Sequence, residues 1–316
     1  MRKSSIYLPE ETKSALRRQA KRAGLSEAQL IRGALERALS QTSPQPAESG
    51  RTRDVRASRM DDRPVPGRLV GVGVGPGEPD LITVRAVEAL RRADVVVAPS
   101  SAPDAVGRAE AIVREVAPEV AVVRVAFDMA PSRQARDRSV DKAASVVSGF
   151  CEAGNEVAWI TLGDPLVYST FPSVAQAVRR LRPSTVVCQV PGIMAFQALA
   201  ARTSTVVADE RTRVTIRTAL DGEDLGPDME DGDTTLVVYK GGRRLPEVAD
   251  VASILGRDRG AVAGELLGMQ GERVGALADI AARGPASYLA TVILPFTRLS
   301  AATTEEGAHH DRWEMG

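Results

Sequence analysis

The stretch GVGVGPGEP, residues 71–79, decides how this chain is interpreted. It follows a short apolar strand pattern at 68–72 and precedes a helical pattern at 81–92. Its glycines allow the backbone to approach a ligand closely, and Pro76 stiffens the turn. A dinucleotide-binding fingerprint would require glycine at position 76, and a phosphate loop would require a Lys-Ser or Lys-Thr pair. The stretch fits neither motif, and alone it is equally typical of a tight turn that binds nothing.

Similar loops follow three further predicted strands. The strands at 157–162, 185–190 and 234–238 end in the loops GDPLVYST, PGI and YKGG. Open α/β sheets bind their ligands outside the carboxyl ends of their strands. The repeated placement of glycine-bearing loops therefore predicts one ligand site that is assembled from several strand ends.

Apolar strand patterns alternate with helical patterns over most of the chain. This alternation predicts an α/β fold with mostly parallel sheets. Residues 220–233, which are rich in Asp, Glu and Gly, are expected to form a connecting loop. The expected strands are 68–73, 94–98, 120–125, 157–162, 185–190, 213–217, 234–239, 261–265 and 288–294.

On these loops, residues 67–297 resemble the tetrapyrrole (corrin/porphyrin) methylases, which use S-adenosylmethionine to methylate rings derived from uroporphyrinogen. The loop GDPLVYST, the segment LLGMQGER at 266–273 and the segment YLATV at 288–292 are most similar to the branch that methylates precorrin-2 at C20. The resemblance implies two α/β domains, 67–170 and 171–297, with the active site between them, and it implies a homodimer.

The implied activity is S-adenosylmethionine-dependent methylation of precorrin-2 or cobalt-precorrin-2 at C20, in cobalamin biosynthesis. Two alternatives stay open. The chain could methylate a tetrapyrrole at another ring position, or it could be a DNA-binding regulator whose methylase-like part senses a ligand. Intact glycine loops in all four places argue against a decayed sensor.

No catalytic residue is assigned, because methyl transfer from a sulfonium to a nucleophilic ring carbon depends mostly on positioning. The resemblance implies that Gly75, Pro76 and Gly77 shape the donor pocket. Glu78 stands where the family usually carries Asp, and Lys240 where relatives often carry Met. The implied cofactor-binding residues are Pro76, Gly163, Asp164, Val167, Ser169, Thr170, Met194, Ala195, Lys240 and Gly268.

A tetrapyrrole substrate would carry many carboxylates, which need Arg or Lys side chains around an apolar trough. The candidates are Arg133, Arg136, Arg138 and Arg243. Because the chain has 41 basic residues, the prediction concerns the group and not its individual members. No metal site is predicted, since the only two histidines are adjacent in the tail, without a Cys or carboxylate cluster.

Residues 1–40 resemble a ribbon-helix-helix DNA-binding module, with a short strand pattern followed by two helical patterns. In that family two chains pair their strands and insert the ribbon into the major groove, which would place Lys3, Ser5 and Tyr7 against the bases. A unit of this size buries too little core to be stable alone, so it requires a partner. The alternative is a small dimerisation arm.

Composition sets the remaining limits. The 41 basic and 41 acidic residues leave a net charge near zero, which argues against a nucleic-acid footprint along the whole chain. No 18-residue apolar run and no secretory signal are visible, so a cytoplasmic protein without a membrane span is expected. Residues 41–66 are expected to form a disordered linker and 298–316 a flexible tail. A start at Met60 is an alternative reading of the N-terminus.

Overall fold

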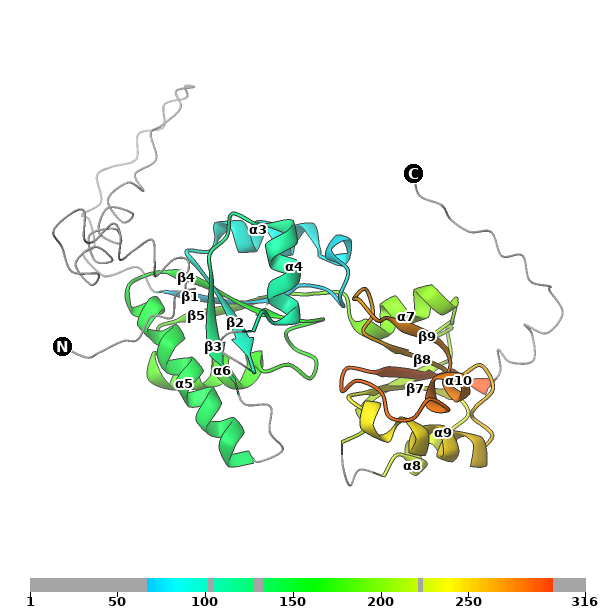
Figure 1. Ribbon diagram of the computed structural model, residues 1–316. Helices are drawn as coiled ribbons and strands as arrows, with labels where there is room; N and C mark the ends of the chain where they lie inside the picture. The colour runs from blue at the N-terminus through cyan, green and yellow to red at the C-terminus, as the bar shows by residue number, and fades with distance from the viewer. Residues whose placement is uncertain (1–66, 102–104, 128–132, 221–223, 298–316) are drawn as a thin grey trace, which may run out of the picture. The chain divides into compact units, whose positions relative to one another are not determined.

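A computed structural model describes residues 67–101, 105–127, 133–220 and 224–297 (Figure 1). The chain divides into two units, 1–63 and 64–316, and all described residues belong to the second. The predicted ribbon-helix-helix module, the linker and the C-terminal tail, together with Lys3, Ser5 and Tyr7, lie outside the described residues.

The first sheet contains five parallel strands. Each strand is hydrogen-bonded to its neighbours in parallel register; for example, Leu69 pairs with Val157 of β4 and with Val187 of β5. β1 and β4 are almost completely buried because helices cover both faces, which explains the apolar residues at their centres. The order is β3 (Val122–Ala126), β2 (Val95–Ser100), β4 (Glu156–Thr161), β1 (Arg68–Gly73) and β5 (Val186–Val190).

Helices lie on both faces of this sheet (Figure 1). Val70, Val72 and Ile160 pack against α3 (Val84–Arg92) and α4 (Arg108–Val116). On the other face, the core around Trp159 packs against α5 (Arg133–Glu152) and α6 (Phe171–Leu181). Trp159 is fully buried, and its ring meets that of Phe127 edge-on at a centroid distance of 6.4 Å. Alternate residues of each strand therefore serve two separate cores.

The second sheet is mixed. Only β6 and β7 pair in parallel, whereas β10 is antiparallel to β7 and to β8, and β8 is antiparallel to β9. The order is β6 (Arg213–Thr218), β7 (Thr234–Tyr239), β10 (Thr291–Leu294), β8 (Val262–Glu265) and β9 (Arg273–Ala276).

The second sheet is also covered on both faces. α7 (Ala195–Thr203) packs on one face. The other face carries α8 (Gly226–Glu230), α9 (Leu245–Ile254) and α10 (Leu277–Ala281), as Figure 1 shows. Two short 3₁₀ turns complete the described elements, η1 at Pro79–Leu81 and η2 at Gly242–Arg244.

A buried arginine joins the loops at one end of the second sheet. Arg257 is only 3 % exposed, and its guanidinium donates to the carbonyl oxygens of Met229, Asp231, Thr234 and Pro295 at 2.7–3.2 Å. Burial lowers the pKa of Arg257, and the nearby Asp231 carboxylate opposes that shift. A longer bond of 3.5 Å reaches the carbonyl oxygen of Leu294. Because one side chain serves five carbonyl groups, it substitutes for backbone pairing where strands give way to loops.

The α/β fold is confirmed, and the predicted bounds of β1 and β7 are correct. The bounds of most other strands shift by one or two residues, and three larger details differ. The last strand begins at Thr291 and not at 288, β9 was not predicted, and α8 lies within the expected loop 220–233. The expected parallel pairing holds throughout the first sheet but for one pair only in the second. The domain boundary near 170 stays a prediction; β5, which follows it, pairs with β1 of the first sheet.

Candidate functional site

The loops that follow β1 and β4 meet at the centre of the first sheet. These strands are neighbours, but the chain leaves β1 toward α3 on one face and leaves β4 toward α6 on the other. A sheet opens a crevice beyond its carboxyl edge where connections diverge in this way. The two loops are joined directly, because the amide of Gly163 donates to the carbonyl of Gly75 at 2.7 Å.

Glycine makes this junction possible. A Cβ atom on Gly73 would overlap the carbonyl oxygen of Gly163 and lie 2.7 Å from the amide nitrogen of Gly192. Three backbone segments, each following a different strand, therefore touch without intervening side chains. The carboxylate of Asp164 strengthens the contact, since it accepts from the amides of Leu166 at 2.8 Å and Gly192 at 3.1 Å.

The end of β7 contributes side chains in place of bare backbone. The hydroxyl of Tyr239 accepts a hydrogen bond from the amide of Phe196, near the start of α7, at 3.1 Å. Burial raises the pKa of Tyr239 to about 12 despite this bond, so the phenol stays neutral at physiological pH. The Nζ of Lys240 donates to the carbonyl of Tyr168 at 3.0 Å. Burial, assisted by the charge of Arg136, lowers the pKa of Lys240.

These elements surround a pocket with a cavity volume of about 110 Å³, several times the space that one water molecule requires. Most of its lining is apolar, with a few polar groups among the aliphatic side chains. This composition is typical of a site for a small organic ligand. The lining residues are Pro76, Arg108, Leu162, Gly163, Asp164, Val167, Tyr168, Met194, Ala195, Tyr239, Lys240, Leu266, Leu267, Met269, Leu289 and Thr291.

Seven of the ten predicted cofactor-binding residues line this pocket, and three do not. Ser169 instead donates its hydroxyl to the carbonyl of Pro165 and accepts from the amide of Phe171 at 3.2 Å. Thr170 precedes α6 without a side-chain capping bond. Gly268 is not part of the lining, although its neighbours Leu267 and Met269 both line the pocket.

Backbone strain gathers at the same place. Tyr168, Lys240 and Leu266 adopt positive φ angles of 48°, 59° and 53°, and all three line the pocket. Among the described residues only one other non-glycine residue does so, Ser204 at the end of α7. Such conformations persist where the surroundings impose them, which is common at ligand sites.

The predicted substrate arginines divide into three cases. Arg136 and Arg243 are exposed, and their charges oppose the rise in the pKa of Tyr288 that burial causes. Arg138 is exposed on α5 without a comparable link to the pocket, and the side chain of Arg133 lies outside the description. Arg108, at the start of α4, lines the pocket but was not predicted, because no motif distinguishes it from other arginines.

Within the described ranges, no cluster of three or more His, Cys, Asp or Glu side chains has the arrangement of a metal site. None of the helices in those ranges combines the length and apolar character that a membrane span requires.

Comparison with known proteins gives consistent results. The family described as Tetrapyrrole (Corrin/Porphyrin) Methylases matches residues 68–281. The precorrin-2 C(20)-methyltransferase of Sinorhizobium sp is 30% identical over 240 residues, which cover 72% of this chain and 95% of that protein. The cobalt-precorrin-2 C(20)-methyltransferase of Salmonella typhimurium is 33% identical over 151 residues, 48% of this chain and 62% of the relative. The chain thus aligns with less than two thirds of the Salmonella protein.

Among solved structures, the uroporphyrin-III C-methyl transferase of Thermus thermophilus, complexed with S-adenosyl homocysteine, has the same fold. It superposes with a TM-score of 0.52 and is 24% identical, and the match covers 74% of this chain and all of that one.

Proposed function

Because this chain belongs to the tetrapyrrole (corrin/porphyrin) methylase family, we propose that it transfers a methyl group from S-adenosylmethionine to C20 of precorrin-2 or cobalt-precorrin-2. Methyl transfer to a tetrapyrrole is the reaction class of the family. The ring position follows the names of the Sinorhizobium and Salmonella relatives and the YST sequence at 168–170. The observation that supports the proposal best is the gathering of seven expected donor-binding residues around one pocket.

The pocket suits the donor. A Cβ atom on Gly163 would meet no atom within 4 Å, so this glycine leaves open space beside exposed backbone. Leu162, Val167 and Met269 offer apolar surface for the adenosyl group, and polar groups of the lining, including Asp164, offer hydrogen-bond partners. When bound, S-adenosylmethionine supplies an electrophilic methyl group on a sulfonium.

The protein's own contribution to such a reaction is placement. A nucleophilic ring carbon attacks a sulfonium without a dedicated base, so the rate depends on holding the reactants in line and excluding water. The backbone junction of Gly73, Gly163 and Gly192 provides a rigid wall for that purpose. Tyr239 fixes the start of α7, and burial raises its pKa to about 12, further from neutral pH.

For the substrate, we propose that Arg108, Arg136 and Arg243 hold peripheral carboxylates. None of the three forms an ion pair within the described part of the chain, whereas Arg213, Arg217 and Arg244 pair with Asp231, Asp228 and Glu247. Exposed cations without a partner near a pocket are available to an anionic ligand.

The decisive experiment is mass spectrometry of the product formed from precorrin-2 and S-adenosylmethionine, with and without cobalt in the ring. We expect the addition of one methyl group, and nuclear magnetic resonance should locate it at C20. Methylation at another carbon would support the alternative of a different ring position. Donor binding without any methyl transfer would support a sensor.

The proposed role of the arginines has its own test. Arg136→Met and Arg243→Met should raise the KM for the tetrapyrrole several-fold while the affinity for the donor stays unchanged. Arg217→Met is the matched control, because this arginine is also partly exposed but already paired with Asp228. Equal KM values in all three variants would remove the arginines from the substrate site.

DNA binding by residues 1–40 and homodimer formation remain part of the proposal and rest on sequence alone. Deleting residues 1–59 should abolish DNA binding and leave methyl transfer intact. Binding by the full chain should weaken steeply with salt, because phosphate contacts release counterions. Dimerisation could come from the methylase part or from residues 1–40. Light scattering on residues 60–316 separates the two, because a monomer would leave pairing through residues 1–40 as the remaining source.

A further inference from the structure

Two loops from different sheets touch along one side of the pocket. The loop 75–78 follows β1, and the loop 266–272 joins β8 to β9. A Cβ atom on Gly77 would overlap the carbonyl oxygen of Leu267, and one on Gly268 would overlap Glu78. The two backbones are therefore in direct contact, and Pro76 and Leu267 beside this contact line the pocket.

A single side chain connects both loops from a third element. Arg202, on α7, forms an ion pair with Glu78 of the first loop. Its Nε also lies 2.6 Å from Oε1 of Glu272 in the second loop. Glu272 in turn accepts a hydrogen bond from the amide of Gly268 at 2.6 Å, which fixes the glycine that abuts Glu78.

Two of the segments in the charged network, α7 and the loop 266–272, also contribute to an apolar cluster. Leu199 of α7, Leu267 of the second loop and Ile293 of β10 are buried in one cluster, and Leu81, shortly after the first loop, packs against it. The side chain of Arg202 is only 23 % exposed, so solvent screens its charge incompletely. Polar and apolar contacts thus both join α7 to the loop 266–272, and Leu81 brings the chain just after the loop 75–78 into the apolar cluster.

We propose that Arg202 is a positioning residue that holds the loops 75–78 and 266–272 together as one wall of the donor pocket. The loops carry a carboxylate each, Glu78 and Glu272, and the guanidinium lies between them. Without this cation two negative charges would face each other across the loop contact and push it apart. The inference rests on the proposed function insofar as the wall serves a bound donor.

The test compares the full-length wild-type protein with Arg202→Met and Arg202→Lys by calorimetric titration with S-adenosylhomocysteine. Arg202→Met should weaken binding about tenfold, equivalent to about 1.4 kcal/mol. Arg202→Lys should restore part of the loss, because it returns the charge without the planar fork. Urea denaturation establishes that each variant remains folded.

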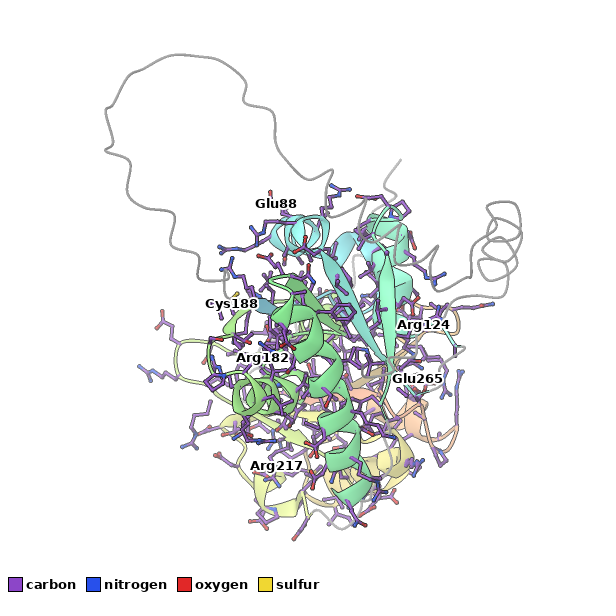
Figure 2. The ribbon with its side chains drawn as sticks, turned by 90° about the vertical axis from the view of Figure 1, so that its left-hand side faces the viewer. Glu88, Arg124, Arg182, Cys188, Arg217 and Glu265 are labelled. Atoms are coloured by element: carbon purple, nitrogen blue, oxygen red, sulfur yellow. The ribbon has the colours of Figure 1, made fainter. Side chains whose placement is uncertain are left out.

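Arg182→Met is the matched control. Arg182, labelled in Figure 2, is 30 % exposed, forms an ion pair with Glu152 and follows the last turn of α6. α6 has 11 residues and begins beside the pocket loop 163–170, so Arg182 lies about 16 Å away along the helix axis. Its removal should leave the affinity for S-adenosylhomocysteine unchanged.

Hydrogen–deuterium exchange tests the contact between the two loops without any ligand. In Arg202→Met the amides of residues 266–272, and that of Gly268 above all, should exchange faster than in the wild type, while Arg182→Met leaves them unchanged. Unaltered exchange and unaltered affinity in a folded Arg202→Met protein would overturn the inference. Absence of binding by the wild type would instead overturn the proposed function, and the exchange result would still decide the role of Arg202.

Discussion

The two sheets hold their loops in place by different means. At the first sheet, loops meet through bare backbone, as at Gly73, Gly163 and Gly192. At the second sheet, side chains do this. Tyr239 fixes the start of α7 beside the pocket, and Arg257 gathers carbonyl groups at the opposite end of the sheet, near the start of β7 and the end of β10. The difference teaches which kind of substitution each sheet tolerates least. The loops of the first sheet should be disrupted when a side-chain atom is added to a glycine. Those of the second sheet should be disrupted when side-chain atoms are removed.

The strongest test of the second sheet is Arg257→Met. The substitution removes the guanidinium that donates to several carbonyl groups, of which those of Met229 and Thr234 are buried, and it should lower the free energy of unfolding by about 3 kcal/mol. Urea denaturation measures the change. Arg259→Met, two residues away and exposed, should shift stability by less than about 0.5 kcal/mol. Similar effects of the two substitutions would mean that the buried network does not hold the second sheet together.

Gly73→Ala tests the backbone junction of Gly73, Gly163 and Gly192 at the first sheet. The added methyl group meets backbone atoms that cannot rotate away, so unfolding should become easier by about 1–3 kcal/mol and donor binding should be lost. Gly149→Ala is the opposite control, because a Cβ there meets no atom within 4 Å and the residue lies in α5. That change should stabilise the protein by about 0.5–1 kcal/mol. If Gly73→Ala binds the donor normally, the backbone junction is not essential to the site.

Asp164→Ala tests whether the first sheet also depends on a side chain, because the Asp164 carboxylate holds the glycine loops together. Losing its bonds to Leu166 and Gly192 should weaken binding of S-adenosylhomocysteine by about 1–2 kcal/mol in calorimetry. Asp164→Asn retains one acceptor oxygen and should fall between wild type and Ala. A larger loss with Asn than with Ala would contradict this explanation.

The smallest expected effect at neutral pH belongs to Tyr239→Phe, about 1 kcal/mol for the lost hydrogen bond. Its pH dependence is more informative. Since burial raises the pKa of Tyr239 from 10.0 to about 12, the folded protein holds a proton that the unfolded chain releases between these values. Wild-type stability should therefore fall as pH rises from 10 to 12, more steeply than that of Tyr239→Phe. Parallel pH profiles would contradict the assigned burial.

Sequence patterns predict the buried strands best. β1 and β7 are correct to the residue: helices cover both faces of each, and each has a run of apolar residues at its centre. β9, Arg273–Ala276, has only four residues of mixed polarity and therefore carries no recognisable period. α8 was missed because GPDME has the composition of a loop, although Met229 at its centre is fully buried.

The site is predictable only in part, for a related reason. Loop residues such as Pro76 and Gly163 stand in motifs, and their resemblance to a family identifies them. Arg108 and Arg202 belong to no motif, and the sequence does not distinguish them from the rest of the chain's 41 basic residues. Their roles depend on distances between elements that are remote in sequence, such as Glu78 and Arg202, and these become visible only in the folded chain.

The fully buried Trp159 gives the first sheet an optical reporter of its own. The chain has two tryptophans, and the other, Trp313, lies outside the described residues. In a Trp313→Phe background, the emission spectrum would come from an indole packed against Phe127 in the core beneath β4. Its red shift during denaturation would follow the melting of one sheet, while circular dichroism follows both. Coincident curves would show that the two sheets unfold as a single cooperative unit.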